Sequence, residues 1–93
     1  MKLQLHIDAR KWFQRSAGNT YHSVRIFYSV GAGEPQEHYI PFAYGYDEQW
    51  LQTALDWLAS EGLAEKGQYG TRYLREDLGG TYSVVDVSRK RDL

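Results

Sequence analysis

The alternation of apolar and polar residues predicts two strands within the first 30 positions. Residues 3–9 alternate with a period of two, as in a strand with one buried face. A turn-forming cluster, residues 16–19, separates them from residues 20–30, which are rich in β-branched and aromatic side chains. One face of this second strand should cover the core with Val24, Ile26, Tyr28 and Val30. The other face then presents Tyr21, Arg25 and Phe27 as a recognition surface.

Residues 37–44 predict a third strand after a glycine-rich hairpin loop. One face of it is expected to carry His38, Ile40, Phe42 and Tyr44. Pro41 has no amide hydrogen to donate, so this strand lies at a sheet edge or contains a bulge. Because edge strands invite pairing with another chain, a homodimer is one expected assembly.

Residues 42–63 predict the end of a strand, an aromatic turn and then the principal helix, which starts with Asp47 as its N-cap. Apolar residues recur at three- and four-residue steps and form one stripe, made of Trp50, Leu51, Ala54, Leu55 and Leu58. Gly62 is expected to end the helix in a left-handed conformation, and Leu63 to fold back onto the last turn.

The remaining pattern completes an α+β fold. Residues 71–78 predict a short helix, with a strand as the competing interpretation. Residues 81–88 predict the last strand, placed beside the first, and residues 89–93 a flexible tail. The expected fold is a single domain over residues 1–93. It is a small antiparallel sheet, in the order strand, strand, strand, helix, short helix, strand, with one main helix packed on one face.

Length and composition limit the classes of function. Ninety-three residues suffice for one core, and the lack of cysteine excludes disulfides, thiolate zinc sites and cysteine nucleophiles. No apolar run has the length of a signal peptide or membrane span, so we expect a cytoplasmic protein with no membrane partner.

Charge is distributed unevenly although the net charge is only −1. Residues 1–30 carry five basic side chains against one acidic, whereas residues 47–65 carry five acidic and no basic ones. The small net charge argues against strong general affinity for phosphate backbones. Opposite charges that neutralise each other across sheet and helix are the favoured interpretation, and two differently charged faces the alternative.

Catalytic patterns are weak in this sequence. His6, His22 and His38 fall on separate strands without the close spacing of a metal site, and no nucleophile elbow or phosphate-binding loop is present. We therefore predict no catalytic residue, metal or cofactor. An enzyme would need a pocket that gathers His22, Tyr46 and a carboxylate.

Aromatic and charged residues suggest two binding surfaces. The first is predicted to consist of Trp12, Arg15, Tyr21, Arg25, Phe27 and Tyr46. The second, acidic, is predicted to consist of Asp47, Glu48, Asp56 and Glu61. Basic groups interleaved with aromatics also suit single-stranded nucleic acid. That alternative predicts that Arg10, Lys11, Arg15, Arg25 and residues 89–91 converge on one uncovered face.

Four segments of the chain resemble a set of short bacteriophage and prophage proteins without an assigned activity. The segments are residues 9–13 (ARKWF), 18–24 (GNTYHSV), 42–46 (FAYGY) followed by 52–55 (QTAL), and 86–93 (DVSRKRDL). The resemblance implies a phage accessory protein that binds and disables a host system, as anti-CRISPR and other anti-defence proteins do. The expected partner is a host protein or protein–nucleic-acid complex in the cytoplasm of an infected bacterium.

Overall fold

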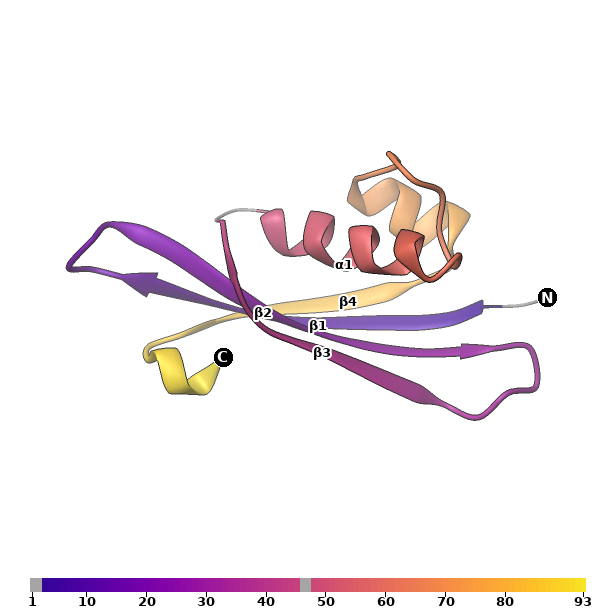
Figure 1. Ribbon diagram of the computed structural model, residues 1–93, viewed down its shortest axis with the longest axis horizontal. Coiled ribbons are helices and arrows are strands. Elements are labelled where there is room, and N and C mark those ends of the chain that lie inside the picture. The colour runs from indigo at the N-terminus through magenta and orange to yellow at the C-terminus, as the bar shows by residue number, and fades with distance from the viewer. Residues whose placement is uncertain (1–2, 46–47) are drawn as a thin grey trace.

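The three predicted early strands form an antiparallel meander, and a helix covers one of its faces (Figure 1). The computed structural model describes residues 3–45 and 48–93. Its principal elements are β1 (Leu3–Gln14), β2 (Asn19–Val30), β3 (Gln36–Tyr44), α1 (Gln49–Ser60) and β4 (Thr81–Val87). The strand order is β3-β2-β1-β4, and the predicted α+β class is confirmed.

The last strand lies beside the first, as expected, but runs parallel to it. The sheet is therefore mixed rather than wholly antiparallel. The cause is the single long helix between β3 and β4. α1 carries the chain back across the sheet, so β4 starts from the same end as β1.

The core lies between α1 and the face of the sheet that it covers. The helix contributes the predicted stripe, and all its members are buried: Trp50, Leu51, Ala54, Leu55 and Leu58. The sheet contributes Leu5, Ile7 and Ala9 from β1 and Val24 and Ile26 from β2, at alternate positions. The predicted core face of the second strand is thus confirmed.

The end of α1 also follows the prediction. Gly62 has φ +75°, and its amide donates to the carbonyl of Ala59. The Leu63 amide donates to the Leu58 carbonyl at 2.9 Å, which completes the six-residue closure of a Schellman motif. Asp47, the predicted N-cap, lies outside the described residues.

A bulge in β3 changes which side chains share a face. Ala43 pairs with His22 and Ile40 with Val24, so Pro41 and Phe42 together stand opposite one residue of β2. The extra residue reverses the alternation. His38 and Ile40 face the helix, whereas Phe42 and Tyr44 lie on the other face, so the predicted common face of these four residues is wrong. Both alternatives for the proline hold, because β3 is an edge strand and Pro41 lies in the bulge.

Residues 71–78 are helical, as favoured over a strand. Their central turn is the short π-helix η1 (Tyr73–Asp77). Leu74 of this turn is fully buried, and its carbonyl accepts from the Gly80 amide at 2.8 Å. A β-carbon at Gly80 would lie 2.8 Å from Leu74 Cδ1 and 3.1 Å from Leu5 Cδ2, so a larger residue there would require these two buried side chains to shift.

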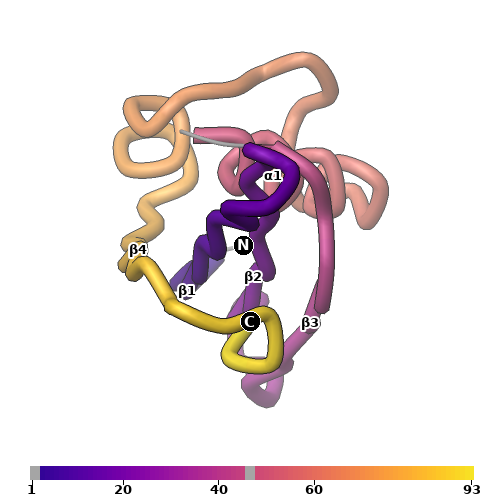
Figure 2. Tube along the Cα trace, turned by 90° about the vertical axis from the view of Figure 1, so that its left-hand side faces the viewer, coloured from indigo at the N-terminus to yellow at the C-terminus, as the bar shows by residue number. Residues whose placement is uncertain are grey.

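The C-terminal segment, residues 89–93, differs from the expected flexible tail. It contains the short 3-10 helix η2 (Lys90–Asp92) and turns back over the sheet face opposite α1 (Figure 2). Leu93 is buried, and its carbonyl accepts a hydrogen bond from the Tyr39 hydroxyl at 2.9 Å. A sequence pattern dominated by charge does not reveal such contacts, because they depend on residues about 50 positions away.

We expect Leu58→Ala to lower the free energy of unfolding by about 2–5 kcal/mol, because Leu58 is fully buried and truncation leaves a cavity. Gln52→Ala is the matched control, since Gln52 is exposed on the same helix and should change stability by less than about 0.5 kcal/mol. Urea denaturation followed by circular dichroism measures both. Equal small effects would mean that α1 does not seal the core.

Candidate functional site

A row of aromatic side chains crosses the open face, which is the sheet face opposite α1. Trp12 of β1 pairs with Tyr21 of β2, which in turn pairs with Tyr44 of β3. The bulge adds Phe42 to the same face. We call these four residues, Trp12, Tyr21, Phe42 and Tyr44, the aromatic row.

The rings of the aromatic row pack on one another. The Tyr21 and Phe42 centroids are 4.6 Å apart with planes 25° from parallel, and Trp12 and Tyr21 are 5.8 Å apart at 26°. Tyr44 meets Tyr21 edge-on at 5.5 Å. Rings that lie flat side by side on a sheet cannot have centroids as close as 4.6 Å, so the Tyr21 and Phe42 rings overlap face to face. The aromatic row therefore presents the edges of its stacked rings to solvent, together with the more exposed rings of Phe42 and Tyr44.

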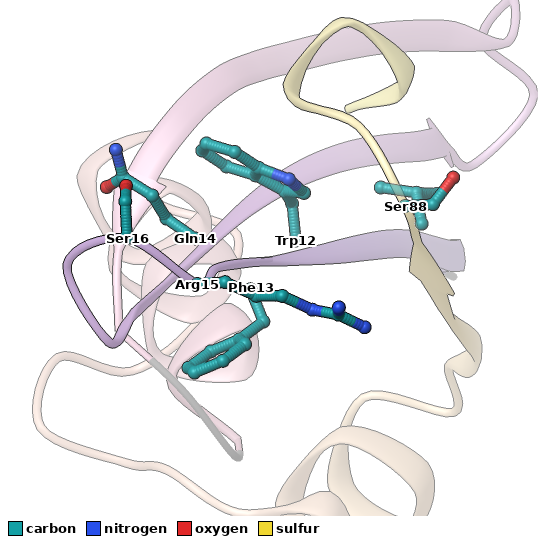
Figure 3. Close-up of a pocket in the computed structure, with 7 residues that line it drawn as sticks. Trp12, Phe13, Gln14, Arg15, Ser16 and Ser88 are labelled. Carbon is teal, nitrogen blue, oxygen red and sulfur yellow. The ribbon is translucent and has the colours of Figure 1, made fainter.

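A groove lies beside the aromatic row at the β1–β2 hairpin. β4 ends at Val87, opposite Trp12, whereas β1 continues to Gln14. The resulting cavity of about 460 Å³ is lined by Trp12, Phe13, Gln14, Arg15, Ser16, Val87 and Ser88. Figure 3 shows that Trp12 and Phe13 point to opposite sides of the strand, while the Arg15 side chain extends along the groove.

The six predicted binding residues do not form one cluster. Trp12 and Tyr21 belong to the aromatic row, and Arg15 lines the adjacent groove. Arg25 and Phe27 lie further along β2 on the same face, where Phe27 stacks on His6 at 6.2 Å. Tyr46 lies outside the described residues.

Sequence reasoning missed the contribution of β3 to this surface. Phe42 and Tyr44 are 43% and 65% exposed and are the most accessible members of the aromatic row. Strict alternation along the strand predicts that these two residues share a face with His38 and Ile40. Pro41 was the available signal, since a proline inside a strand favours a bulge and hence a change of face.

The predicted acidic surface lies on the opposite layer. Glu48, Asp56 and Glu61 are exposed on α1 and its flanks, and Asp47 lies outside the described residues. The Asp56 carboxylate accepts a hydrogen bond from the Tyr69 hydroxyl, and this bond raises the pKa of Tyr69. Within residues 3–45 and 48–93, the one ion pair joins Arg72 to Glu76. Among these residues, direct ion pairs do not join the acidic helix layer to the basic strands, and neutralisation across sheet and helix stays a prediction.

The basic residues do not all converge on one uncovered face. Lys11 pairs with His22 on the side of the sheet that faces the helix. Arg10 and Arg25 lie on the open face, but the C-terminal segment covers part of it. Arg15 belongs to the hairpin, and residues 89–91 are exposed. Arg10, Arg25 and Lys90 thus share the open face whereas Lys11 does not, so the convergence of the basic residues is partial.

The three histidines have separate environments. His6 hydrogen-bonds to Thr81 at 2.7 Å, and the His38 ring stacks on Trp57 with centroids 4.1 Å apart. His22 is fully buried between β2 and α1. Among the described residues, no group of three histidine, cysteine, aspartate or glutamate side chains could hold a metal ion.

Hydrogen bonds define the protonation of His22. Nδ1 lies 3.3 Å from the Gly45 carbonyl, which can only accept, so Nδ1 carries the proton. Nε2 then accepts from the Thr53 hydroxyl at 2.8 Å. Burial lowers the pKa of His22, and the bond to the Gly45 carbonyl only partly opposes this effect. His22 is thus a neutral link between the sheet and α1.

In the part of the chain that the structure describes, no helix is both long and apolar enough to cross a membrane. Comparison of the chain with protein-family models, with curated proteins and with solved structures finds no match.

We expect stability to fall with acidification in a way that depends on His22. Its pKa in the folded state lies below the ordinary value of 6.5, so the unfolded chain binds the extra proton more readily. The contribution of neutral His22 is complete above pH 6.5 and is lost as the pH falls from there through the lowered pKa.

Urea denaturation at about pH 7.5 and about pH 5.5 tests this expectation. His22→Gln should reduce the loss of stability between the two pH values, whereas His6→Gln, at a site on the open face, should preserve it. An unchanged pH dependence in His22→Gln would show that other groups cause the loss.

Proposed function

We propose that this protein is a non-enzymatic phage accessory protein that binds a host protein complex and modulates it, in the manner of anti-CRISPR and other anti-defence inhibitors. The observation that carries the proposal is the aromatic row beside the groove that Arg15 lines. Tryptophan, tyrosine and arginine are the residues that most often dominate binding energy in protein interfaces. Here they lie together on a solvent-facing surface.

The packing of the row suits a protein partner. The Tyr21 ring faces Phe42 on one side and Trp12 on the other, so its faces are already occupied. Rings held in this way lose little conformational freedom on binding, which reduces the entropic cost of association. The neighbouring groove has room for a side chain from the partner, with the Arg15 guanidinium available for a carboxylate or carbonyl.

The position of the surface also supports the proposal. The β1–β2 hairpin extends past the start of α1 at one end of the molecule (Figure 1). A partner can approach the hairpin without contacting the helix layer. The principal axes of the molecule extend over 46, 25 and 19 Å, so this end is well separated from the opposite β2–β3 hairpin.

The resemblance to short phage proteins supplies the biological setting. It supports action in the cytoplasm of an infected bacterium, on a host protein or protein–nucleic-acid complex. The acidic layer around Asp56 and Glu61 is a second surface in this proposal, and it suits a partner whose own ligand is nucleic acid.

One observation favours direct nucleic-acid binding as the second candidate. Lys90 Nζ lies 4.9 Å from the centre of the Phe42 ring, and Arg89 and Arg91 are exposed beside it. Cations next to aromatic rings are typical of single-strand binding surfaces. The overlapping rings and the net charge of −1 favour the protein partner.

We expect Tyr44→Ala to lower recovery of a host protein complex by the tagged protein at least tenfold, because Tyr44 is the most exposed ring of the aromatic row. Gln36→Ala is the control: Gln36 is also exposed, but it begins β3 at the opposite end of the sheet and belongs to neither proposed surface. Capture from host lysate, quantified by mass spectrometry with and without nuclease, measures both variants.

The nuclease treatment separates the two candidates. A stoichiometric protein complex that survives nuclease and depends on Tyr44 supports the proposed function. Recovery of nucleic acid, with every accompanying protein lost after nuclease, would replace it with the second candidate. Equal recovery by Tyr44→Ala and Gln36→Ala would show that the aromatic row is not part of the binding surface.

A further inference from the structure

Four polar side chains lie together near the centre of the open face, beneath the C-terminal segment. Arg10 of β1 pairs with Ser23 of β2, and Arg25 is two positions further along β2 on the same face. Tyr39 of β3 pairs with Arg25. Neighbours of this kind lie about 5–8 Å apart on one face of a sheet. We call these residues, Arg10, Ser23, Arg25 and Tyr39, the donor cluster.

The C-terminal segment satisfies only part of the donor cluster. Arg10 Nη1 donates to the Asp92 carbonyl at 2.8 Å, and the Tyr39 hydroxyl donates to the Leu93 carbonyl at 2.9 Å. Ser23 is fully buried, yet its hydroxyl has no hydrogen-bond partner among the described residues. Arg25 Nη1 is likewise buried and unpartnered there, with the guanidinium 4.4 Å above the centre of the Tyr39 ring.

An excess of buried donors defines what the cluster can bind. A buried guanidinium nitrogen and hydroxyl without acceptors are costly, and a charged acceptor relieves that cost best. Asp8 pairs with Arg25 across the strands on this face, but its carboxylate accepts from the Ser83 hydroxyl, and the ion pairs of the described residues do not include Arg10 or Arg25. A carboxylate has two oxygens and can accept from several donors at once. Each carbonyl of the C-terminal segment supplies only one oxygen.

We propose that the donor cluster is a binding site for an acidic peptide segment of the protein partner, and that residues 89–93 are a strap that occupies this site until the partner displaces it. The proposal rests on the proposed function and specifies the chemistry of the partner. The strap itself shows that the site accommodates a peptide, because main-chain carbonyls of residues 92 and 93 already accept from Arg10 and Tyr39.

The strap is held by contacts that can be exchanged. It makes the two hydrogen bonds above and places Lys90 over Phe42. Leu93 is buried, but it does not belong to the core cluster between sheet and helix. Release of the strap therefore leaves the core intact. The contact of Lys90 with Phe42 also joins the strap to the aromatic row, so one partner can engage both sites.

Nuclear magnetic resonance of the full chain tests the proposal with defined probes. The probe is a terminally blocked tetraglutamate peptide, with tetraglutamine as its neutral counterpart and a short oligothymidylate as the nucleic-acid counterpart. Binding at the donor cluster should shift the Arg25 Nε–H and Ser23 amide signals. Displacement of the strap should at the same time increase hydrogen exchange at the Asp92 and Leu93 amides, which donate within the strap.

A loosened strap should strengthen binding. Leu93→Ala removes the buried side chain that anchors the strap, and Lys90→Ala removes the cation above Phe42, while all four residues of the donor cluster are kept. In the double variant, the open fraction and the apparent affinity for tetraglutamate should rise roughly tenfold. Arg25→Gln should abolish the response, whereas Arg75→Gln, which removes an exposed cation of η1 on the helix layer, should not.

Each outcome decides the proposal. Shifts with tetraglutamate alone, stronger in the loosened variant, support it. No shift at Arg25 or Ser23 in the loosened variant, which retains both residues, would overturn it even if Arg25→Gln fails to fold. A response to oligothymidylate but not to tetraglutamate would also overturn it. If capture of a host complex still depends on Tyr44, the proposed function is retained and only the proposal about the strap and the donor cluster is rejected.

Discussion

The structure depends on burial of one apolar stripe of α1 against one face of a narrow sheet. Leu55 and Leu58 of the helix and Ile7 and Ile26 of the sheet are all almost fully buried. A domain of this size has room for one such core, so the opposite face of the sheet receives no second helix layer. Because of that constraint, the open face is covered only by its own side chains and by the C-terminal segment. The aromatic row and the C-terminal segment both follow from it.

The bulge at Pro41 connects edge protection with the binding surface. A proline and an extra residue make the edge of β3 a poor template for continuous pairing with another strand. The homodimer through this edge stays a prediction, and its expected register is interrupted at Pro41. The same extra residue turns Phe42 and Tyr44 onto the open face, where they extend the contact between Trp12 and Tyr21 across three strands.

Charge is divided between the two layers of the molecule. Exposed carboxylates, including Asp56 and Glu61, lie on the helix layer, whereas Arg10 and Arg25 lie on the open face. Within the described residues these groups are not joined by ion pairs, so the carboxylates of α1 and the guanidinium groups of the open face are available to different partners, or to different parts of one partner. The open face is not purely basic, because Asp8 pairs with Arg25 on it. The strap moderates the basic face by placing main-chain carbonyls on its donors.

Local sequence pattern is enough to predict the helix, the first two strands and the core residues Val24 and Ile26. These features depend on local periodicity and on end signals such as Gly62, which act within a few residues. It also determined that Tyr21, Arg25 and Phe27 share the face away from the helix. Only the tertiary structure decided the parallel β4, the side chains displayed by β3 and the position of residues 89–93. Each of these depends on contacts between distant residues, such as Tyr39 and Leu93, or on a single-residue shift that periodicity cannot place.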